Sequence, residues 1–434
     1  MKNIKTVIII TGLPFRKQGN QSLIRFLDMF LKRNIKVIMF SAGSDTRGEN
    51  EIKHTLFSFF KIKSLEISFT NFLNQTYSRL KNTKTINKKN YFDSIKSETI
   101  IPPHGNYTFS NFLNKWLKLF LNIIDNILLA FYLCFKHSKK IKNTSIIIGY
   151  EQSYTLSAKI MSFIFKKIYI NKFQGTILKA TNRNITKAIK FFPHNFFGIN
   201  KSDCCIMVND GTDGKYYAHL RGCKNVFFEP HGVLLYNHKN QKNHFINKFK
   251  KKGKFILFNN ASTSTWKRSD RIIRGLSKID PKILPNIILI TTYNASNKTE
   301  LINFTKSKKL EKNVIFLEKI DSNESNYILQ RSDIAIMTND FSNLGNPILE
   351  AIYYKTPIIS IYDQSLKGFL NNNVDSVLIK LNNQFDKNLA HAIKKLYKNK
   401  KLYKRFEQNL NKNNQVKELT IQQKREFNSI KKLL

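Results

Sequence analysis

The fold is decided by residues Arg331 to Tyr362, RSDIAIMTNDFSNLGNPILEAIYYKTPIISIY. The apolar run Ile334 to Met337 is typical of a strand covered on both faces, and the small and polar residues from Asn339 to Asn346 are typical of a loop. Pro347 suits the first turn of a helix, because its missing N–H would have had no intrahelical partner there. A second apolar run, Ile358 to Ile361, follows. The pattern predicts a strand, a loop, a helix and a strand of a parallel sheet.

The start of this helix is suited to bind an anion. Asn346 is a natural cap, and the first N–H groups of a helix lack intrahelical acceptors while the helix dipole adds positive charge. We therefore expect the amides from Gly345 to Leu349 to face the crevice beyond the strand ends, where a diphosphate binds favourably. Glu350, on the first turns, is then within reach of a sugar hydroxyl of the same nucleotide. An ordinary buried strand-helix-strand unit with a capped helix is the alternative.

The segments SDIAIM, NLGNPILEAI and KTPIIS resemble the donor site of family-4-type glycosyltransferases, which have the GT-B fold. In that family two glutamates eight positions apart bracket the loop; the second holds the donor ribose and the first lies near the transferred sugar. Glu350 matches the second, whereas Ser342 stands at the first, which leaves Asp340 as the candidate carboxylate. The resemblance also assigns donor contacts to Asn343, Leu344, Gly345 and Asn346.

A second donor-binding loop is expected after the apolar run Phe255 to Phe258. The resembled family places an arginine on this loop and a lysine five residues later, and both grip the donor diphosphate. Lys267 matches the lysine, whereas Ser262 stands at the arginine position, so Arg268 is the candidate to replace its charge. A solvated Lys-Arg pair is the alternative in a chain this basic.

The first half of the chain opens with an apolar run, a glycine loop and a helical pattern, which predict the start of a parallel sheet. The resemblance places Gly12 of that loop near donor and acceptor. Gln174 stands where the family often has the histidine of a His-Gly pair, and it is, with Asp340, a candidate catalytic residue. Asp210 and Gly211 lie in an Asn-Asp-Gly-Thr turn found in some members. Tight turns with a positive φ at glycine are the alternative for both glycine loops.

A chain of 434 residues is too long for one hydrophobic core and predicts two domains. The lysine-rich stretch Tyr236 to Lys254 has the composition of a linker. We therefore predict an α/β protein with the GT-B fold, in which two Rossmann-like, doubly wound domains face each other across a cleft. Residues 1–238 form the acceptor domain, residues 239–400 the nucleotide-sugar domain, and residues 401–434 closing helices that cross back to the first domain.

The net charge of +44, from 73 Lys and Arg against 29 Asp and Glu, predicts a surface attracted to polyanions such as anionic lipid, acidic glycans or nucleic acid. No nucleic-acid module is recognisable, so no specific nucleic-acid partner is predicted. The four cysteines have no metal-ligand spacing, which favours a reducing compartment. No metal and no cofactor are predicted.

The longest apolar stretch, Phe112 to Phe135, contains several polar and charged residues, so it does not meet the requirement of about 20 mostly apolar residues for a membrane span. Its apolar residues recur at helical spacing, which fits either a core helix or an interfacial membrane helix. The run Val7 to Ile10 is too short for a signal peptide. We expect a cytoplasmic protein that associates peripherally with the inner face of the cell membrane, with the lysine-rich segment Asn71 to Phe109 as an insertion in the first domain.

Together these features predict a glycosyltransferase that moves a sugar from a UDP- or GDP-sugar to a glycan or lipid-linked acceptor, in surface polysaccharide or glycolipid synthesis. The resemblance implies retention of the anomeric configuration without a bound metal. A catalytically impaired GT-B protein and a sugar-nucleotide epimerase are the alternatives that share the fold. A polyanion-binding protein is the third alternative, and it would account for the charge alone.

Overall fold

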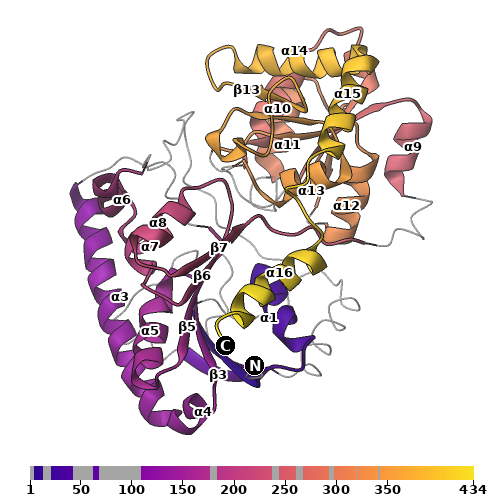
Figure 1. Ribbon diagram of the computed structural model, residues 1–434. Coiled ribbons are helices and arrows are strands. Elements are labelled where there is room, and N and C mark those ends of the chain that lie inside the picture. The colour runs from indigo at the N-terminus through magenta and orange to yellow at the C-terminus, as the bar shows by residue number, and fades with distance from the viewer. Residues whose placement is uncertain are drawn as a thin grey trace. The chain divides into compact units, whose positions relative to one another are not determined.

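The computed structural model describes residues 4–12, 21–42, 62–67, 109–175, 183–236, 244–260, 267–292, 298–318, 320–340 and 343–434 (Figure 1). These residues form two compact units. Unit 1 contains the described residues up to Glu229 together with Ile421–Leu434, and unit 2 contains those of Pro230–Thr420. Each unit has its own sheet and its own cores.

Unit 1 is built on a seven-stranded sheet in the order β3-β2-β1-β4-β5-β6-β7, parallel except for β3, which pairs antiparallel with β2. Its strands are β1 Thr6–Thr11, β2 Lys36–Ala42, β3 Ile62–Ile67, β4 Ile146–Tyr150, β5 Ile168–Phe173, β6 Cys204–Val208 and β7 Asn225–Glu229. Its helices are α1 Gln21–Leu31, α3 Phe109–Lys136, α4 Ser138–Lys142, η2 Gln152–Tyr154, α5 Thr155–Ile164, α6 Ile185–Phe191, α7 Pro193–Gly198, α8 Gly214–Leu220 and α16 Leu419–Lys431.

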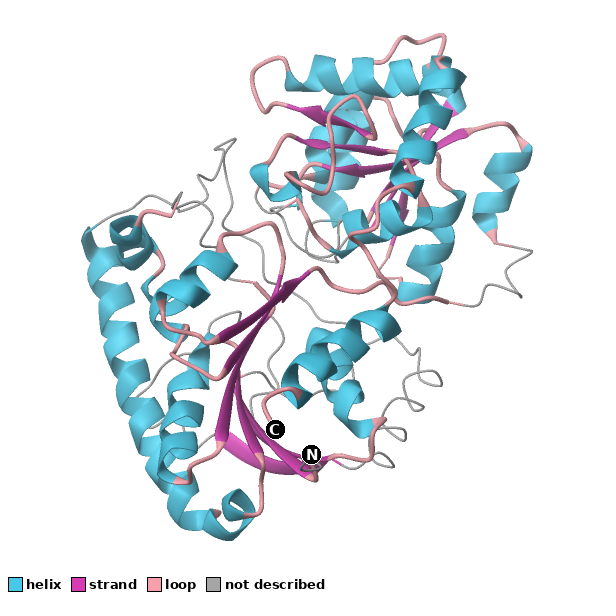
Figure 2. Ribbon diagram, in the orientation of Figure 1, coloured by secondary structure: helices cyan, strands magenta, loops and turns pink. Residues whose placement is uncertain are grey.

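Helices cover both faces of this sheet (Figure 2). Val7 and Ile9 of β1 point to one face, where the core includes residues of α1 and, from α16, Ile430. Ile8 and Ile10 point to the other face, where the core includes residues of α3 and α5. Successive side chains of a strand point to opposite faces, and both faces are buried here. This is why β1 is apolar at every position from Val7 to Ile10.

Unit 2 is built on a six-stranded, all-parallel sheet in the order β10-β9-β8-β11-β12-β13. Counted from β8, this is the Rossmann order 3-2-1-4-5-6. Its strands are β8 Phe255–Asn259, β9 Ile287–Thr292, β10 Val314–Leu317, β11 Ile334–Met337, β12 Ile358–Ile361 and β13 Ser376–Ile379. Its helices are α9 Phe245–Lys251, α10 Ser269–Leu276, η5 Leu284–Asn286, α11 Lys298–Ser307, α12 Ser322–Arg331, α13 Asn346–Tyr354, η6 Gln364–Leu366, α14 Phe385–Lys398 and α15 Lys400–Asn411.

The stretch that decided the sequence interpretation forms β11, α13 and β12 as predicted. One detail differs. Gly345 caps α13 and Asn346 is its first helical residue, so the expectation that Asn346 is the cap was wrong. The carbonyl oxygen of Gly345 accepts the first bonds of the helix, from the N–H groups of Ile348 and Leu349, and Pro347 still lies in the first turn, where its missing N–H costs no intrahelical bond.

Helices α10 and α14 pack closely on one face of this sheet. A Cβ atom at Gly275 of α10 would lie 2.6 Å from Cδ2 of Leu389 in α14. This close approach requires glycine at position 275 and fixes the position of α10. The first residues of α10 lie at the carboxyl ends of the strands of unit 2.

Candidate active site

The strand order of unit 2 reverses between β8 and β11, and open parallel sheets bind ligands beyond the carboxyl ends of the strands at such a point. Asn259, the last residue of β8, is fully buried there. Its Nδ2 donates to the carbonyl oxygen of Ile336 in β11 at 2.8 Å, and its Oδ1 accepts from Ser269 Oγ at 2.9 Å and from Thr291 Oγ1 at 3.1 Å. Asn259 therefore ties β8, β9, β11 and the start of α10 into one rigid frame.

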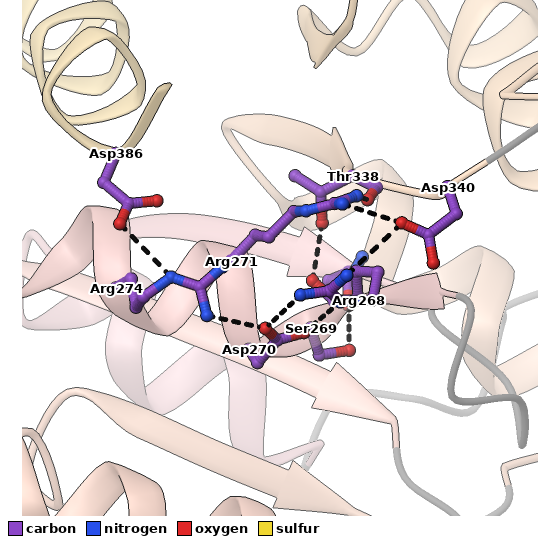
Figure 3. Close-up of polar contacts among 9 residues, drawn as sticks. Arg268, Ser269, Asp270, Arg271, Arg274, Thr338, Asp340 and Asp386 are labelled. Carbon is purple, nitrogen blue, oxygen red and sulfur yellow. Dashed lines mark hydrogen bonds and ion pairs between the residues drawn. The ribbon is translucent and has the colours of Figure 1, made fainter. Parts of the chain in front are cut away.

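Arg268 precedes α10 and has a left-handed backbone, with φ 53° and ψ 46°. Thr338, which follows β11, donates from Oγ1 to the carbonyl oxygen of Arg268 at 2.8 Å. The guanidinium of Arg268 makes two parallel contacts to Asp270, at 2.9 and 3.0 Å (Figure 3). Its Nη1 lies 3.4 Å from Oδ1 of Asp340. The predicted replacement cation is thus held at the switch point, beside the predicted carboxylate.

Arg271, one turn further along α10, is the principal partner of Asp340. Its Nη2 lies 2.7 Å from Asp340 Oδ1, and its Nη1 donates to the carbonyl oxygen of Thr338 at 2.8 Å (Figure 3). The side chains of Arg271 and Asp340 are 3% and 7% exposed, so the pair is largely removed from water. Burial lowers the pKa of Arg271. The carboxylate of Asp340 therefore neutralises a buried arginine, a contact that links α10 to the loop after β11.

The ion pairs continue along α10 to Arg274, which contacts Asp270 at 2.7 Å and Asp386 of α14 at 3.2 Å (Figure 3). Burial works to raise the pKa of Asp270, but the hydrogen bonds and charges of Arg268 and Arg274 outweigh it, and the pKa is lowered. All the acids of this network are therefore arranged around guanidinium groups.

Lys267, the predicted partner of the donor diphosphate, lies directly before Arg268. Burial lowers its pKa to about 8. A nearby negative charge raises the pKa of a buried lysine and restores the protonated form that burial disfavours. Binding an anion therefore stabilises Lys267 in its charged form.

The loop before α13 is held by the side chain of Asn343 and by the side chains of Asp363 and Ser365, which follow β12. Asn343 donates from its backbone N–H to Asp363 Oδ2 at 3.0 Å, and its Oδ1 accepts from the N–H of Asn339 at 3.1 Å. Leu344 is buried in the core, and its N–H donates to Ser365 Oγ at 3.2 Å. The side chains of Asn343 and Leu344 therefore build the loop.

The expected row of free amides at the start of α13 is shorter than the sequence predicted. The N–H of Gly345 donates to the carbonyl oxygen of Asn343, and those of Ile348 and Leu349 donate to Gly345. Pro347 has no N–H. The turn before the helix and the first bonds of the helix occupy these groups, so Asn346 is the residue in this part of the described chain whose amide is left for an anion. Glu350 lies half-buried on the second turn of α13.

The candidate residues of unit 1 gather at the carboxyl edge of its own sheet. Gln174 follows β5; its N–H donates to Glu151 Oε1 at 2.7 Å, and its Nε2 donates to the hydroxyl of Tyr150 at 2.9 Å. Glu151 follows β4 and has φ 63° and ψ 170°, a combination that is almost confined to glycine. Burial raises the pKa of Glu151 to about 7, although the Gln174 amide and Lys172 oppose the shift.

Asp210 and Gly211 form the predicted turn after β6. Gly211 has φ +75°, and the Oδ1 atoms of Asn209 and Asp210 accept from the backbone N–H groups two residues on, at 3.0 and 3.1 Å. A Cβ atom at Gly175 would lie 2.1 Å from Asp210 Oδ2, so Asp210 reaches the turn after β5. The backbone conformation thus explains Gly211 without a ligand. Gly12 directly follows β1 at the same edge.

Sequence reasoning missed Arg271 and Glu151. Both carried a signal, because Glu151 directly follows an apolar strand and Arg271 lies one helical turn after Arg268. Ser262 and Ser342, where the chain departs from the family pattern, lie outside the described residues. Among the described residues, no group of three or more His, Cys, Asp or Glu could hold a metal ion.

Residues 239–413 match the family model described as Glycosyl transferases group 1. HepE from Anabaena, solved in complex with UDP, has a TM-score of 0.62 and 14% sequence identity, over 99% of this chain and 100% of that chain. Sucrose-phosphate synthase from Thermosynechococcus elongatus has a TM-score of 0.62 and 11% identity, over 99% of each chain. A glycosyltransferase from Rickettsia africae has a TM-score of 0.57 and 14% identity, over 100% of this chain and 99% of that chain. No curated protein matches the chain in sequence.

These matches define the fold of the chain and the family of its second domain. Two Rossmann-like units in one chain are the GT-B architecture, which the structural similarity bears out over nearly the whole length. The second unit matches the glycosyl transferases group 1 model over residues 239–413, and the chain as a whole has the GT-B fold.

Proposed function

We propose that the protein transfers a glycosyl group from a nucleoside-diphosphate sugar to a hydroxyl group of a glycan or lipid-linked acceptor. The observation that carries the proposal is the group of basic residues at the switch point of unit 2, where Lys267 and Arg268 precede α10 and Arg268 contacts Thr338 and Asp340 after β11. A diphosphate is the anion that fits a cationic crevice at the carboxyl edge of a Rossmann sheet. UDP is the preferred nucleotide, because HepE has been solved with UDP and with UDP-glucose.

In this proposal the chemistry is one bond exchange. The bond between the anomeric carbon and the β-phosphate oxygen breaks, the acceptor oxygen bonds to the same face of that carbon, and the acceptor proton passes to the departing phosphate oxygen. Lys267, Arg268 and the amide of Asn346 stabilise the negative charge that develops on the diphosphate, which is the effect of preorganised donors in other group transfers. Glu350 binds the donor ribose, and Asp340 serves the sugar site.

For the acceptor we propose the carboxyl edge of the unit 1 sheet, with Gln174, Glu151 and Asp210 as hydrogen-bonding groups. Carboxylates and amides suit hydroxyl-rich ligands, since they accept from and donate to the same sugar hydroxyls. A lipid-linked acceptor would place the enzyme at the cytoplasmic surface of the membrane, in the synthesis of a surface polysaccharide or glycolipid.

A screen of UDP- and GDP-sugars by ligand-induced thermal shift, followed by mass spectrometry of the reaction products, tests the proposal. We expect one nucleotide class to raise the melting temperature and a glycosylated product to form with an acceptor. Conversion of the donor to its epimer without an acceptor would establish the epimerase instead. Binding without any conversion would indicate a catalytically impaired protein, and no thermal shift with any nucleotide would refute the donor site itself.

A further inference from the structure

Helix α3, Phe109–Lys136, packs one apolar face into the core of unit 1 and exposes a second set of large apolar side chains to solvent. The polar residues of its central turns are buried: Asn122 is 8% exposed, and Asp125 and Asn126 are each 1% exposed. A series of large apolar side chains recurs every three or four residues and is exposed to solvent. This apolar face comprises Leu117, Phe120, Ile123, Ile127, Phe131 and Phe135, which are 56, 60, 37, 37, 59 and 90% exposed.

Hydrogen bonds fix the helix in this orientation. Asn122 and Asn126 donate from Nδ2 to the carbonyl oxygen of Ser153 at 3.0 and 2.8 Å. Asn126 Oδ1 accepts from the backbone N–H of Ser157 at 2.9 Å, and Ser157 Oγ donates to the carbonyl oxygen of Asn126 at 2.9 Å. Turning the apolar face inward would break these bonds and leave buried polar groups of α5 without partners, which is costly. The exposure of the apolar face is therefore a built feature of unit 1.

The same hydrogen bonds set the register of α3 and α5, which run side by side in the same direction (Figure 1). The C-terminal end of α5 therefore lies alongside that of α3. Phe163 and Ile164 are 84% and 44% exposed there, and Phe135 is the most exposed residue of the apolar face. The exposed apolar surface thus widens at this end.

The charge around this end has one sign. Residues 109–175 contain ten lysines and no arginine, and their two acidic residues are Asp125, which is buried, and Glu151, which lies at the sheet edge. Lys167 Nζ donates to the carbonyl oxygen of Lys142 at 2.7 Å, so the segment after α5 contacts the end of α4. The lysines exposed at this end are Lys136, Lys139, Lys142 and Lys166.

We infer that the apolar face of α3, with Phe163 and Ile164, is the surface by which unit 1 binds an anionic lipid bilayer. An exposed apolar face bordered by lysines is the arrangement of a helix that lies in the membrane interface, with its apolar side chains among the acyl chains and its lysines at anionic headgroups. The inference deepens the proposed function and rests on it in one respect, since a lipid-linked acceptor would bring the enzyme to a membrane.

Two other arrangements fit the observations less well. By length and composition, Leu119–Lys136 could cross a membrane, contrary to the sequence expectation, but 39% of this window is buried in unit 1. Crossing would move Asn122, Asp125 and Asn126 out of their protein contacts into hydrocarbon. A second copy of the chain could cover the face, but it would not account for the lysines at the C-terminal end of α3, which anionic headgroups would neutralise. The helix is therefore expected to lie on the bilayer.

Sedimentation of the full chain with vesicles tests the surface. We expect binding to vesicles of phosphatidylcholine with 30% phosphatidylglycerol, little binding to phosphatidylcholine alone, and weaker binding at high salt. Phe120→Ser/Phe131→Ser should lower the partition coefficient at least tenfold, because two exposed phenylalanines no longer enter the bilayer. Lys139→Gln/Lys142→Gln should lower it roughly tenfold on the anionic vesicles alone. Val374→Ser/Leu381→Ser, which removes exposed apolar residues of unit 2, should leave it unchanged.

Wild-type protein that ignores anionic vesicles at low salt, or a phenylalanine variant that binds them as tightly as wild type, would overturn the inference. A dimer in solution that this variant converts to monomer would assign the face to a second copy instead. The UDP-induced thermal shift, measured on the same preparations, separates the two proposals. A retained shift with no vesicle binding refutes the surface alone, whereas vesicle binding without a nucleotide shift refutes the donor site alone.

Discussion

The contact between Arg271 and Asp340 allows a quantitative test of the donor site. Arg271→Met leaves the largely buried carboxylate of Asp340 with Arg268 at 3.4 Å as its remaining cation and removes the donor to the Thr338 carbonyl oxygen. Removing one partner of a buried ion pair costs about 3–5 kcal/mol in the free energy of unfolding. Asp340→Asn should cost about 1–3 kcal/mol, since the amide oxygen still accepts a weaker hydrogen bond.

The double variant decides whether the two residues act together. Once Asp340 is neutral, the loss of Arg271 no longer strands a charge, so the double variant should cost less than the sum of the single variants. We expect a coupling energy of about 1–3 kcal/mol. Urea titration followed by hydrogen exchange at the amides of β11 is the appropriate measurement, because the two units can unfold separately. Costs that add to within about 0.5 kcal/mol would refute the reasoning.

Turnover rates of wild type, Arg271→Met, Asp340→Asn and the double variant test whether Asp340 takes part in catalysis. If Asp340 contacts the transferred sugar, Asp340→Asn should lower kcat and leave the donor KM nearly unchanged, and it should do so again in the Arg271→Met background. If Asp340 serves only to position Arg271, the second substitution should have little further effect on kcat. An unchanged rate for Asp340→Asn would show that Asp340 has a structural role and no catalytic one.

Three further outcomes are expected. Glu350→Gln should raise the nucleotide dissociation constant about tenfold or more with little change in melting temperature, because a charge-assisted hydrogen bond to ribose contributes about 1.5–3 kcal/mol; unaltered affinity in a titration would contradict the ribose role. Donor affinity should fall as the pH rises through about 8, where Lys267 loses its proton, and Lys267→Gln should remove this dependence from binding curves measured between pH 6.5 and 9. The pKa of Glu151 is raised to about 7 in the folded state, so wild-type stability should fall between pH 5 and 8 while that of Glu151→Gln stays flatter, by up to about 3 kcal/mol in urea titrations; parallel pH profiles would show that the carboxyl is not buried in solution.

Local patterns in the sequence predicted β11, α13 and β12 because each element there depends on its own residues. Apolar runs mark strands covered on both faces, and Pro347 marks the helix start. The same reasoning reached Lys267 and Arg268 through a family pattern read along the chain. It could not reach the contact of Arg271 with Asp340, since residues 69 positions apart meet there only after α10 has packed against the carboxyl end of β11.

Helix α3 shows a different limit, because its apolar spacing fitted both a core helix and an interfacial membrane helix. The asparagines and the aspartate between Lys118 and Phe131 argued against a membrane-spanning helix when only composition was known. Their side chains are buried and, for Asn122 and Asn126, bonded to the segment that leads into α5, so the face turned to solvent is more apolar than the average of the helix. Composition averages over faces that a helix separates by about 100° per residue, and only the packing tells which face is outside.

The charges along α10 also indicate which arginine is available to the donor. Arg268, Arg271 and Arg274 recur every three residues, so their guanidinium groups share one side of the helix and would repel one another without the acids between them. Asp340 is held by Arg271 at 2.7 Å and by Arg268 at 3.4 Å. An incoming diphosphate competes with Asp340 for these cations, and it displaces the longer contact at the smaller cost. Arg271 also holds the carbonyl oxygen of Thr338. We therefore expect Arg268 to turn toward the phosphates while Arg271 keeps Asp340 in place.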